Sequence, residues 1–497
     1  MFKKKIELIK PITYPEGINP EIDGLFQLGT DNRLYRSLRR LFETFYIYTK
    51  PHRELYLVGG CVRDLLLGRT PKDYDLCTNA TPDEVKQICD SLHLKYFDSG
   101  IKHGTITIID DFYHQQYEIT TYRIDGKYTD GRHPDEVTFT PSLEEDLKRR
   151  DFTINSFAYN LLENELVMLN ESFLYDLKFG IIRTVGDPAE RYEEDALRML
   201  RAIRFASQLN FNLEKYTYSA LSMCASLMSK ISKERIRDEL TKILLSDNPQ
   251  YLEFITTTGI EQYLFDGITP ITDMVNCEHQ NPWHYTDVFH HTIDVVKAVP
   301  KTFVLRWSAL FHDMGKPSVK KPRPQGPEGH FVYYDHPEKS AEIADQIMEI
   351  LKFSNEEKDL IHKFVLYHDY ALSDVSNKKF KQKIVEIGEE NFLAFIQLRQ
   401  ADALAHRLAA STSFAIDAIS VVKDRFTKYI LNPEPMRIKD LAINGDDIVK
   451  DGFLQGKEIG ECLNWMLNIV LENPEFNTRE KLLELLEQFK EMSFQNS

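Results

Sequence analysis

Two aspartates separated by one residue, Asp73 and Asp75, form the pattern with the clearest chemical meaning in this sequence. Alternate side chains of a strand point to the same face, so a strand here would let both carboxylates hold one cation. Upstream, Gly59 and Gly60 predict a strand-to-helix turn whose backbone N–H groups are free to bind phosphate. Paired aspartates are often only solvated loop residues, but this turn and Arg63 favour a site for phosphoryl or nucleotidyl transfer.

A two-metal site needs a further ligand on a neighbouring strand, and Glu118 is the best candidate. From the sequence alone, Glu118 could equally well be an exposed carboxylate on a strand that binds no metal. If the three carboxylates held Mg²⁺, the metal would activate a terminal hydroxyl and stabilise the charge on an α-phosphate. Asp73, Asp75 and Glu118 are therefore the predicted catalytic residues.

Arginines and polar side chains gather in the segment Arg149–Asn155. The guanidinium group of Arg150 suits a triphosphate, because its planar donors match phosphate oxygens. Asp151 and Asn155 could contact ribose hydroxyls. A helix start capped by Asp151 explains the same residues equally well.

Glu194, Asp195 and Arg198 lie at an expected helix start. Asp195 and Arg198 are three residues apart and would be adjacent on one face. A carboxylate acceptor beside a guanidinium donor can meet the Watson–Crick edge of a nucleobase, although a surface ion pair is the simpler explanation. Basic residues continue through Arg201 and Arg204, and they would form either a local RNA-binding face or a solvated helix surface.

The elements that must position these groups are predicted from hydrophobic spacing. Strands are expected over 54–58, 73–76, 105–109 and 117–122, the last two as an antiparallel hairpin. Helices are expected over 32–48, 193–209 and 232–245. The predicted fold class is α+β, with a small mixed β-sheet head followed by all-helical domains.

Length and composition limit the class of protein. The chain has 497 residues, more than one hydrophobic core can organise, so several domains are expected. Its net charge of −16 argues against coating nucleic acid by bulk electrostatics. No signal peptide, membrane-length apolar segment or C-x-x-C pair is present. These features predict a cytoplasmic, reduced protein without structural zinc, DNA partner or membrane partner.

Five motifs in order resemble those of class II tRNA nucleotidyltransferases, a family that includes CCA-adding enzymes and bacterial poly(A) polymerases. They lie at 57–64, 73–75, 149–155, 194–205 and 234–240. The resemblance implies that Asp73 and Asp75 hold magnesium and that Arg63 belongs to the triphosphate site. It further implies that the residues around Asp151 contact ribose. A protein template would select CTP and then ATP; its members would be Glu194, Asp195 and Arg198.

Two further segments separate the branches of this family. Ser99–Thr105 has the form of CCA-adding relatives, where poly(A) polymerases tend to carry a basic G-R-R-F-type element. Arg123–Pro134 resembles the flexible loop of the same relatives. We therefore expect addition of C, C and A to tRNA, with tRNA, CTP and ATP as partners. Poly(A) addition is the alternative within the same chemistry.

A second group of candidate ligands lies far along the chain. In order these residues are His291, His312, Asp313, His336, His368 and Asp402. Imidazoles and carboxylates together suit Mn, Ni, Co or Fe, and Mg less strongly. The pattern resembles HD-type metal-dependent phosphohydrolases, and the resemblance selects His291 over His290 and implies that Lys316 could contact phosphate. A degenerate helical domain retained for RNA contact is the structural alternative.

HD-containing CCA-adding enzymes are a subset of the family, and some hydrolyse 2′,3′-cyclic phosphates or other phosphoesters. A metal-dependent phosphohydrolase with an RNA-binding head is therefore the alternative of another class; the complete aspartate pair speaks against it. The expected domains are a lead-in (1–30), a catalytic head (31–165), a helical neck with base-recognition and RNA-binding helices (166–275), an HD domain (276–428) and a tRNA-binding helical tail (429–497).

Overall fold

The computed structural model describes residues 32–48, 52–98, 100–126, 136–278, 286–324, 330–406, 409–451 and 456–495. The chain divides into two compact units, residues 1–268 and 269–497. The expected lead-in lies outside the described residues, as do Ser99 and most of the expected flexible loop at 127–134.

A seven-stranded mixed sheet organises the first unit, with the order β3-β4-β5-β2-β1-β8-β9. Only β2 and β5 pair in parallel; the other neighbours are antiparallel. The strands are β1 Leu55–Val58, β2 Asp75–Thr78, β3 Lys95–Phe97, β4 Thr105–Asp110, β5 Gln115–Thr121, β8 Phe157–Asn160 and β9 Glu165–Met168. The predicted mixed sheet and the predicted hairpin, which is β4–β5, are confirmed.

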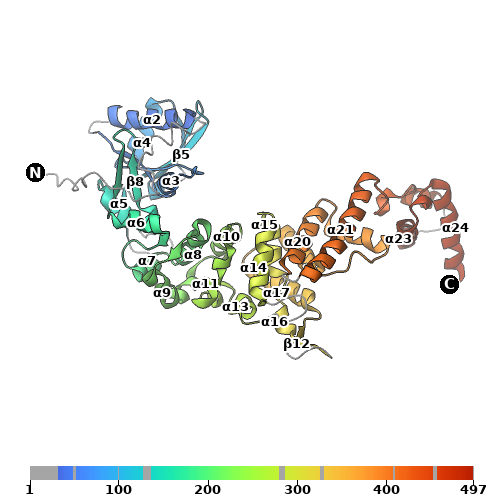
Figure 1. Ribbon diagram of the computed structural model, residues 1–497. Helices are drawn as coiled ribbons and strands as arrows, with labels where there is room; N and C mark the ends of the chain where they lie inside the picture. Colours follow the sequence, from blue (N-terminus) through green and yellow to red (C-terminus); the bar gives the residue numbers. More distant parts are fainter. Residues whose placement is uncertain are drawn as a thin grey trace, which may run out of the picture. The chain divides into compact units, whose positions relative to one another are not determined.

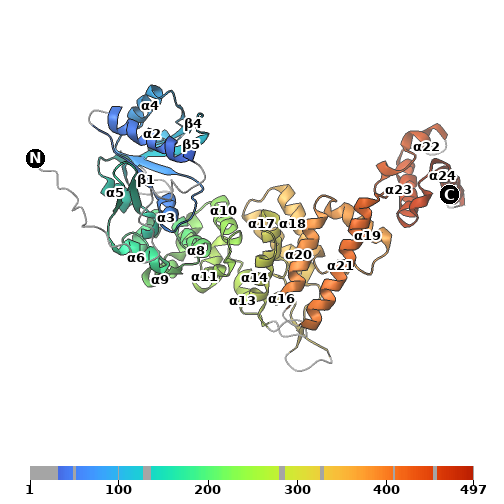
Figure 2. The ribbon, with the colours of Figure 1, turned by 45° about the horizontal axis from the view of Figure 1, so that its top comes forward.

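Burial alternates along the hairpin because one sheet face packs on helices. In β5, Tyr117 and Ile119 are buried while Glu118 between them is exposed, as the two-residue period of a strand requires. The helices of this part are α2 Asn32–Tyr48, α3 Gly60–Leu66 and α4 Pro82–Ser91. Both ribbon views show α2 and α4 side by side (Figures 1 and 2). Glu118 is thereby turned to the open face.

The remaining elements of the first unit are mostly helical. The helices are α5 Leu143–Lys148, α6 Ser172–Phe179, α7 Pro188–Glu194, α8 Leu197–Leu209, α9 Lys215–Cys224, α10 Lys233–Leu244, α11 Glu253–Thr257 and α12 Glu261–Leu264. Two small two-stranded sheets pair β6 Arg123–Asp125 with β7 Val137–Phe139, and β10 Ile181–Ile182 with β11 Asn212–Leu213.

Three boundaries differ from the sequence predictions. Asp73 precedes β2, because the pairing of β2 with β5 begins only at Asp75. The helix expected over 193–209 is broken: Asp195 is extended between α7 and α8, and its carboxylate accepts from the Leu197 N–H. The head sheet continues through β9, so the expected boundary at residue 165 falls inside the sheet.

The second unit is almost entirely helical. Its helices are α13 Pro270–Val275, α14 Val288–Ala298, α15 Phe303–Phe311, α16 Lys316–Val319, α17 His336–Ile350, α18 Asn355–Tyr367, α19 Asn377–Ile387, α20 Phe392–Ala405, α21 Ala409–Leu431, α22 Gly445–Asp451, α23 Lys457–Glu472 and α24 Arg479–Gln495. A hairpin pairs β12 Lys321–Pro322 with β13 Phe331–Val332. Helix α20 packs on α14, α15 and α21, and α20 and α21 run side by side in Figure 2. The last three helices share a core of their own around Ile448, Cys462 and Met466.

Among the helices that the structure describes, none combines the length and the apolar character needed to cross a membrane. All six cysteines are buried and free.

Candidate active site and a second metal cluster

Three carboxylates meet on the open face of the sheet in the first unit. Asp75 and Glu118 are direct partners on the parallel strands β2 and β5, and side chains directly opposite each other share a face. Asp73 lies two residues before Asp75, and all three residues are exposed. The structure thus brings the predicted catalytic carboxylates together, although only two of them lie on strands.

The electrostatics of this group favour a cation. Loss of solvent around the Asp75 carboxylate, followed by the charges of Glu118 and Asp73, raises its pKa to about 6, while Arg150 acts in the opposite direction. The residue as a whole is exposed, so the neighbouring charges are an important part of this effect. A divalent ion would compensate the repulsion between these carboxylates, and carboxylate oxygens are the ligands that Mg²⁺ prefers.

Metal binding at the three carboxylates is expected to weaken below pH 6. Because the pKa of Asp75 is raised to about 6, ionising this group destabilises the metal-free fold as the pH rises from about 4 towards 6. Below about pH 6 a metal ion must displace this proton, so its affinity should fall roughly tenfold for each pH unit by which the pH is lowered. Titration calorimetry with Mg²⁺ or Mn²⁺ from pH 5 to 8 measures this dependence. A pH-independent affinity would contradict it, and Asp75→Asn should remove the dependence together with tight binding.

Gly59 closes the turn between β1 and α3 in a conformation that glycine favours, with φ of 75°. Its N–H donates to the Phe157 carbonyl at 3.2 Å, so the prediction that this N–H is free for phosphate is wrong. The glycine instead makes room for a side chain: a Cβ atom there would lie 3.1 Å from Nη1 of Arg150. The turn therefore holds an arginine close to the carboxylates.

Gly59→Ala is expected to destabilise the fold by about 1–3 kcal/mol through backbone strain and also to displace Arg150. Gly68→Ala is the matched control, since Gly68 has φ of +68° and an added Cβ would meet nothing within 4 Å. Urea denaturation and nucleotide addition are measured for both variants. Both should lose stability, and only Gly59→Ala should lose most of its activity; equal activity in the two would show that the contact with Arg150 is unimportant.

Four of the predicted nucleotide-site residues are joined by consecutive hydrogen bonds. Arg63 Nη1 donates to Asn155 Oδ1 at 2.6 Å, and Asn155 Nδ2 donates to Asp151 Oδ1 at 3.2 Å. Arg201, on α8, donates to Asp151 Oδ2 from Nε at 2.9 Å and from Nη2 at 2.5 Å. These hydrogen bonds connect α3 of the sheet region to α8, the helix that also carries Arg198.

Asp151 has no spare acceptor for ribose. Besides Arg201 and Asn155, the N–H of Phe152 donates to Oδ1 at 2.8 Å, so both oxygens accept two hydrogen bonds, which fills a carboxylate. Burial alone would raise the pKa of Asp151, but the charge of Arg201 holds it at about 2. The expected contact between Asp151 and ribose would require one of these bonds to break; in this structure the carboxylate orients Arg201.

Phe205 gathers three arginines, of which the sequence analysis had grouped only Arg201 with Arg204. The guanidinium carbons of Arg63, Arg201 and Arg204 lie 5.3, 5.4 and 4.2 Å from the centre of its ring, within the range of cation–π attraction. Burial and then the charge of Arg201 lower the pKa of Arg204 to about 10. Arg204 also donates to Glu239 at 3.1 Å. Such a concentration of positive charge suits a polyphosphate.

Among the expected base-selecting residues, Arg198 pairs with Glu194, and Asp195 has a partner outside the group. Arg198 donates from Nη1 to Glu194 at 2.5 Å and from Nη2 to the Arg149 carbonyl at 3.2 Å. Asp195 accepts from Arg235 at 2.9 Å. The predicted Asp195–Arg198 pair on one helix face is therefore wrong, because Asp195 lies before α8. Both groups are nevertheless held rigidly at the start of α8.

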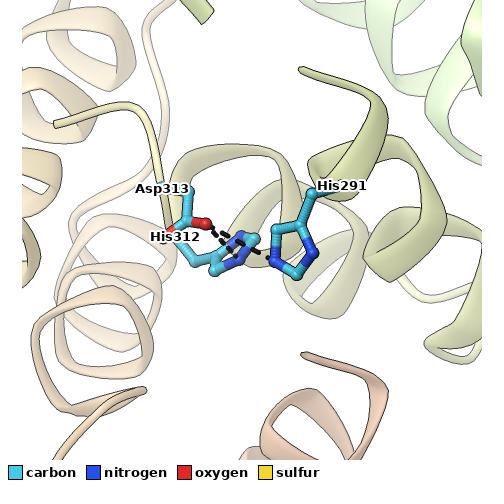
Figure 3. A group of neighbouring side chains, drawn as sticks. All are labelled: His291, His312 and Asp313. Atoms are coloured by element: carbon cyan, nitrogen blue, oxygen red, sulfur yellow. Dashed lines mark ion pairs between the residues drawn. The ribbon is translucent and has the colours of Figure 1, made fainter. Parts of the chain in front are cut away.

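The second unit brings all six predicted ligands of the histidine-rich segment together. His291 lies on α14 and Asp402 on α20, while the other four lie at or next to helix ends: His312, Asp313, His336 and His368. Figure 3 shows the rings of His291 and His312 turned toward the Asp313 carboxylate. Five of the six are buried, and two ligand groups form around Asp313, each with its candidate ligand atoms within 4.8 Å of one another.

The two carboxylate oxygens of Asp313 face different imidazoles. Oδ2 lies 3.5 Å from Nε2 of His291 and 3.3 Å from Nε2 of His312. Oδ1 lies 3.5 Å from Nε2 of His336 and 3.7 Å from Nε2 of His368. Asp402 Oδ1 completes the first group at 3.0 Å from His291 Nε2. Asp313 therefore belongs to both groups of candidate metal ligands.

Backbone hydrogen bonds orient the imidazoles as metal ligands. In His312, His336 and His368 the Nδ1 atom lies 2.7–2.8 Å from the carbonyl three residues earlier, so Nδ1–H is the donor and Nε2 presents its lone pair. Nε2 of His336 and His368 then face each other at 3.2 Å, which is unfavourable for two lone pairs without a cation. His312 Nε2 and Asp313 Oδ1 are buried and make no hydrogen bond.

The charge state of the cluster also fits a metal centre. Burial, with a smaller effect of Lys316, lowers the pKa of His336 to about 3, and burial likewise lowers the pKa of His291 and His368. Neutral imidazole is the form that binds metal. Burial alone would raise the pKa of Asp313, but His312 and Lys316 hold it well below its usual range. Asp313 in turn raises the pKa of His312 against the effect of burial, so a metal ion would take the place of the proton on this ring. The residues present therefore fit one or two transition-metal ions.

Several neighbours of both sites were absent from the sequence prediction. Asp146 accepts from Arg149 at 2.7 Å and from Arg150 at 3.2 Å, and its spacing of four residues before Arg150 was the available signal. His406 Nε2 lies 3.7 Å from Asp402, again four residues along a helix. Lys316, by contrast, was expected to contact phosphate, and in this structure it donates to Asp313 Oδ2 at 2.6 Å.

Comparison with known proteins gives consistent matches along the chain. Family models match residues 55–183 (Poly A polymerase head domain), 210–272 (Probable RNA and SrmB-binding site of polymerase A) and 334–486 (tRNA nucleotidyltransferase domain 2 putative). The CCA-adding enzyme of Lactobacillus delbrueckii subsp. bulgaricus is 34% identical over 434 residues, which cover 87% of this chain and 93% of the relative.

Two further relatives extend the comparison. The CCA-adding enzyme of Lactobacillus helveticus is 52% identical over 437 residues, which cover 87% of this chain and 93% of the relative. The crystal structure of the Bacillus stearothermophilus CCA-adding enzyme in complex with CTP is similar with a TM-score of 0.68 and 26% identity, over 94% of this chain and 100% of that one.

Proposed function

This chain belongs to the family of CCA-adding enzymes, which are tRNA nucleotidyltransferases, and from this premise we propose how its residues add C, C and A to the 3′ end of tRNA. The observation that carries the proposal is the direct pairing of Asp75 with Glu118, next to Asp73. CTP, ATP and tRNA are the partners. A solved relative is in complex with CTP, which supports CTP as a substrate.

Asp73, Asp75 and Glu118 would hold Mg²⁺, which when bound activates the 3′-hydroxyl and stabilises charge on the α-phosphate. The 3′-hydroxyl loses its proton to solvent and its oxygen forms a bond to the α-phosphorus. The bond from this phosphorus to the oxygen that bridges to the β-phosphate breaks, and pyrophosphate leaves. Arg150 lies near Asp75 and would contact the triphosphate together with the arginines around Phe205. Their fixed positions limit the reorganisation needed as charge develops.

Arg198 and Asp195 would present donors and acceptors to the incoming base, with Glu194 orienting Arg198 through their 2.5 Å ion pair. Arg198→Ala should reduce discrimination between CTP and UTP or between ATP and GTP about 10- to 100-fold, since a bidentate base contact contributes about 1–3 kcal/mol. Arg39→Ala is the control, because Arg39 pairs with Glu43 on the exposed surface of α2 in the same unit. Single-turnover incorporation of each nucleotide measures the ratio. Unchanged selectivity in Arg198→Ala would refute the template.

A second activity is supported by the cluster around Asp313. We propose that His291, His312, Asp313, His336, His368 and Asp402 hold one or two divalent ions, with Mn, Ni, Co, Fe and Mg as candidates, and hydrolyse a phosphoester. The buried Nε2 of His312 and Oδ1 of Asp313, which make no hydrogen bond, carry this proposal. A bound ion would supply a nucleophilic hydroxide and polarise the phosphoryl oxygens. The expected HD domain thus remains a proposal supported by geometry.

A further inference from the structure

A cavity of about 660 Å³ opens beside the metal cluster of the second unit. Asp313, His336, His368 and Asp402 line one part of it, so a molecule in the cavity can reach the proposed ions. The volume is that of a small-molecule site. The cavity therefore defines where the substrate of the second activity would bind.

Arg399 lines the same cavity but is not one of the proposed metal ligands. It lies on α20, one helical turn before Asp402. Its Nη1 atom is buried and makes no hydrogen bond, which is costly for a guanidinium group. The ring of Phe395, at 5.9 Å, gives it a weak cation–π contact. An anionic ligand in the cavity would supply the missing acceptor.

Charges around the cavity indicate the charge of that ligand. Three cationic side chains line it, namely Lys316, Arg323 and Arg399, against five aspartates: Asp313, Asp335, Asp369, Asp374 and Asp402. With two divalent ions held by the cluster, the net charge becomes plus two. A dianion neutralises this charge, whereas a diester monoanion leaves half of it uncompensated.

We propose that this cavity binds a phosphate monoester as its dianion and that Arg399 donates from Nη1 to a terminal phosphate oxygen. The proposal rests on the second activity proposed above and names its substrate class. In the reaction, a water oxygen forms a bond to phosphorus, the ester P–O bond breaks, and the departing alcohol oxygen takes up the proton that the water loses. Arg399 is a binding residue for the phosphate and takes no proton.

The organic part of the ester would contact the rim of the cavity. Tyr334 and Phe414 line this region and are 68% and 71% exposed, an unusual exposure for such large rings. Flat aromatic groups stack on exposed rings. A monoester with an aromatic group is therefore the best probe.

The test compares p-nitrophenyl phosphate, a monoester, with bis-p-nitrophenyl phosphate, a diester, on the full chain loaded with Mn²⁺ or Ni²⁺. The wild type should hydrolyse the monoester with the higher kcat/KM. Arg399→Gln should lower this value roughly 10- to 100-fold, mainly through KM, as expected for one charged hydrogen bond; the diester value should change less than about threefold. Arg399→Lys should recover part of the loss, and Arg479→Gln, an exposed arginine in α24, should behave as wild type.

Binding of inorganic phosphate, followed by calorimetry on the same metal-loaded proteins, separates this proposal from the hydrolase proposal. If neither ester is hydrolysed but phosphate binds and Arg399→Gln weakens it at least tenfold, the cavity assignment stands and the hydrolase proposal fails. If Arg399→Gln affects monoester and diester alike, or leaves phosphate binding unchanged, the assignment of Arg399 is overturned.

Discussion

Asp75→Asn should lower the rate of nucleotide addition to tRNA by about 10³-fold or more, because it removes the charge of a carboxylate expected to hold the catalytic ion. The substitution keeps the shape of the side chain at the first residue of β2 and relieves its repulsion with Glu118. The fold should therefore be at least as stable as the wild type in the absence of metal. Single-turnover addition of CMP and the urea midpoint are the two measurements.

Asp111→Asn is the matched control for this substitution. Asp111 follows β4 of the same sheet, and its side chain is 60% exposed in an ion pair with Lys95, so its removal should change addition less than about twofold. Retention of more than a tenth of the wild-type rate in Asp75→Asn would contradict the role of the carboxylates. Hydrolysis of phosphoesters by the second unit should be unaffected.

His312→Ala is expected to have the opposite pattern. His312 is fully buried, and its Nε2 faces Asp313 at 3.3 Å. Losing this ligand should remove most of the metal from the second unit and lower phosphoester hydrolysis by about 10²- to 10³-fold. Addition of nucleotides to tRNA should remain within about twofold. Metal content by mass spectrometry is the direct readout, since it does not depend on the substrate.

Stability must be separated from metal loss in this variant, because a buried ring is removed. His312→Gln keeps most of the volume, and His362→Ala, whose ring pairs with Asp345 at the surface of α18, is the control for histidine loss. If addition and hydrolysis fell together in either Asp75→Asn or His312→Gln while the protein remained folded, the assignment of two independent sites would be wrong.

Local patterns allowed much of the first site to be predicted. Strand patterns predicted Glu118 as a further ligand on a neighbouring strand, and in the folded sheet it lies directly opposite Asp75. The same reasoning failed for Asp73, because β2 begins only where β5 provides a partner. For Asp151, the local pattern did not show which residue fills its carboxylate, because Arg201 lies fifty residues later and meets it only in the folded protein.

At the second site, too, the contacts made only in the folded protein could not be predicted from the sequence. Sequence order and resemblance selected its six candidate ligands, but not the backbone bonds that orient three of their rings. These bonds come from helix ends, where a carbonyl three residues earlier is available to the ring of His312, His336 or His368. Arg399 belongs to no motif, and only the cavity reveals its unsatisfied Nη1 atom.

One assay tests the central claim most directly. The full chain is incubated with Mg²⁺ and a tRNA that lacks its last three nucleotides, with CTP, with ATP, or with both. We expect two additions with CTP alone, three with both nucleotides, and then termination, with the product sequence ending in CCA. A long ladder of additions with ATP alone would contradict the account.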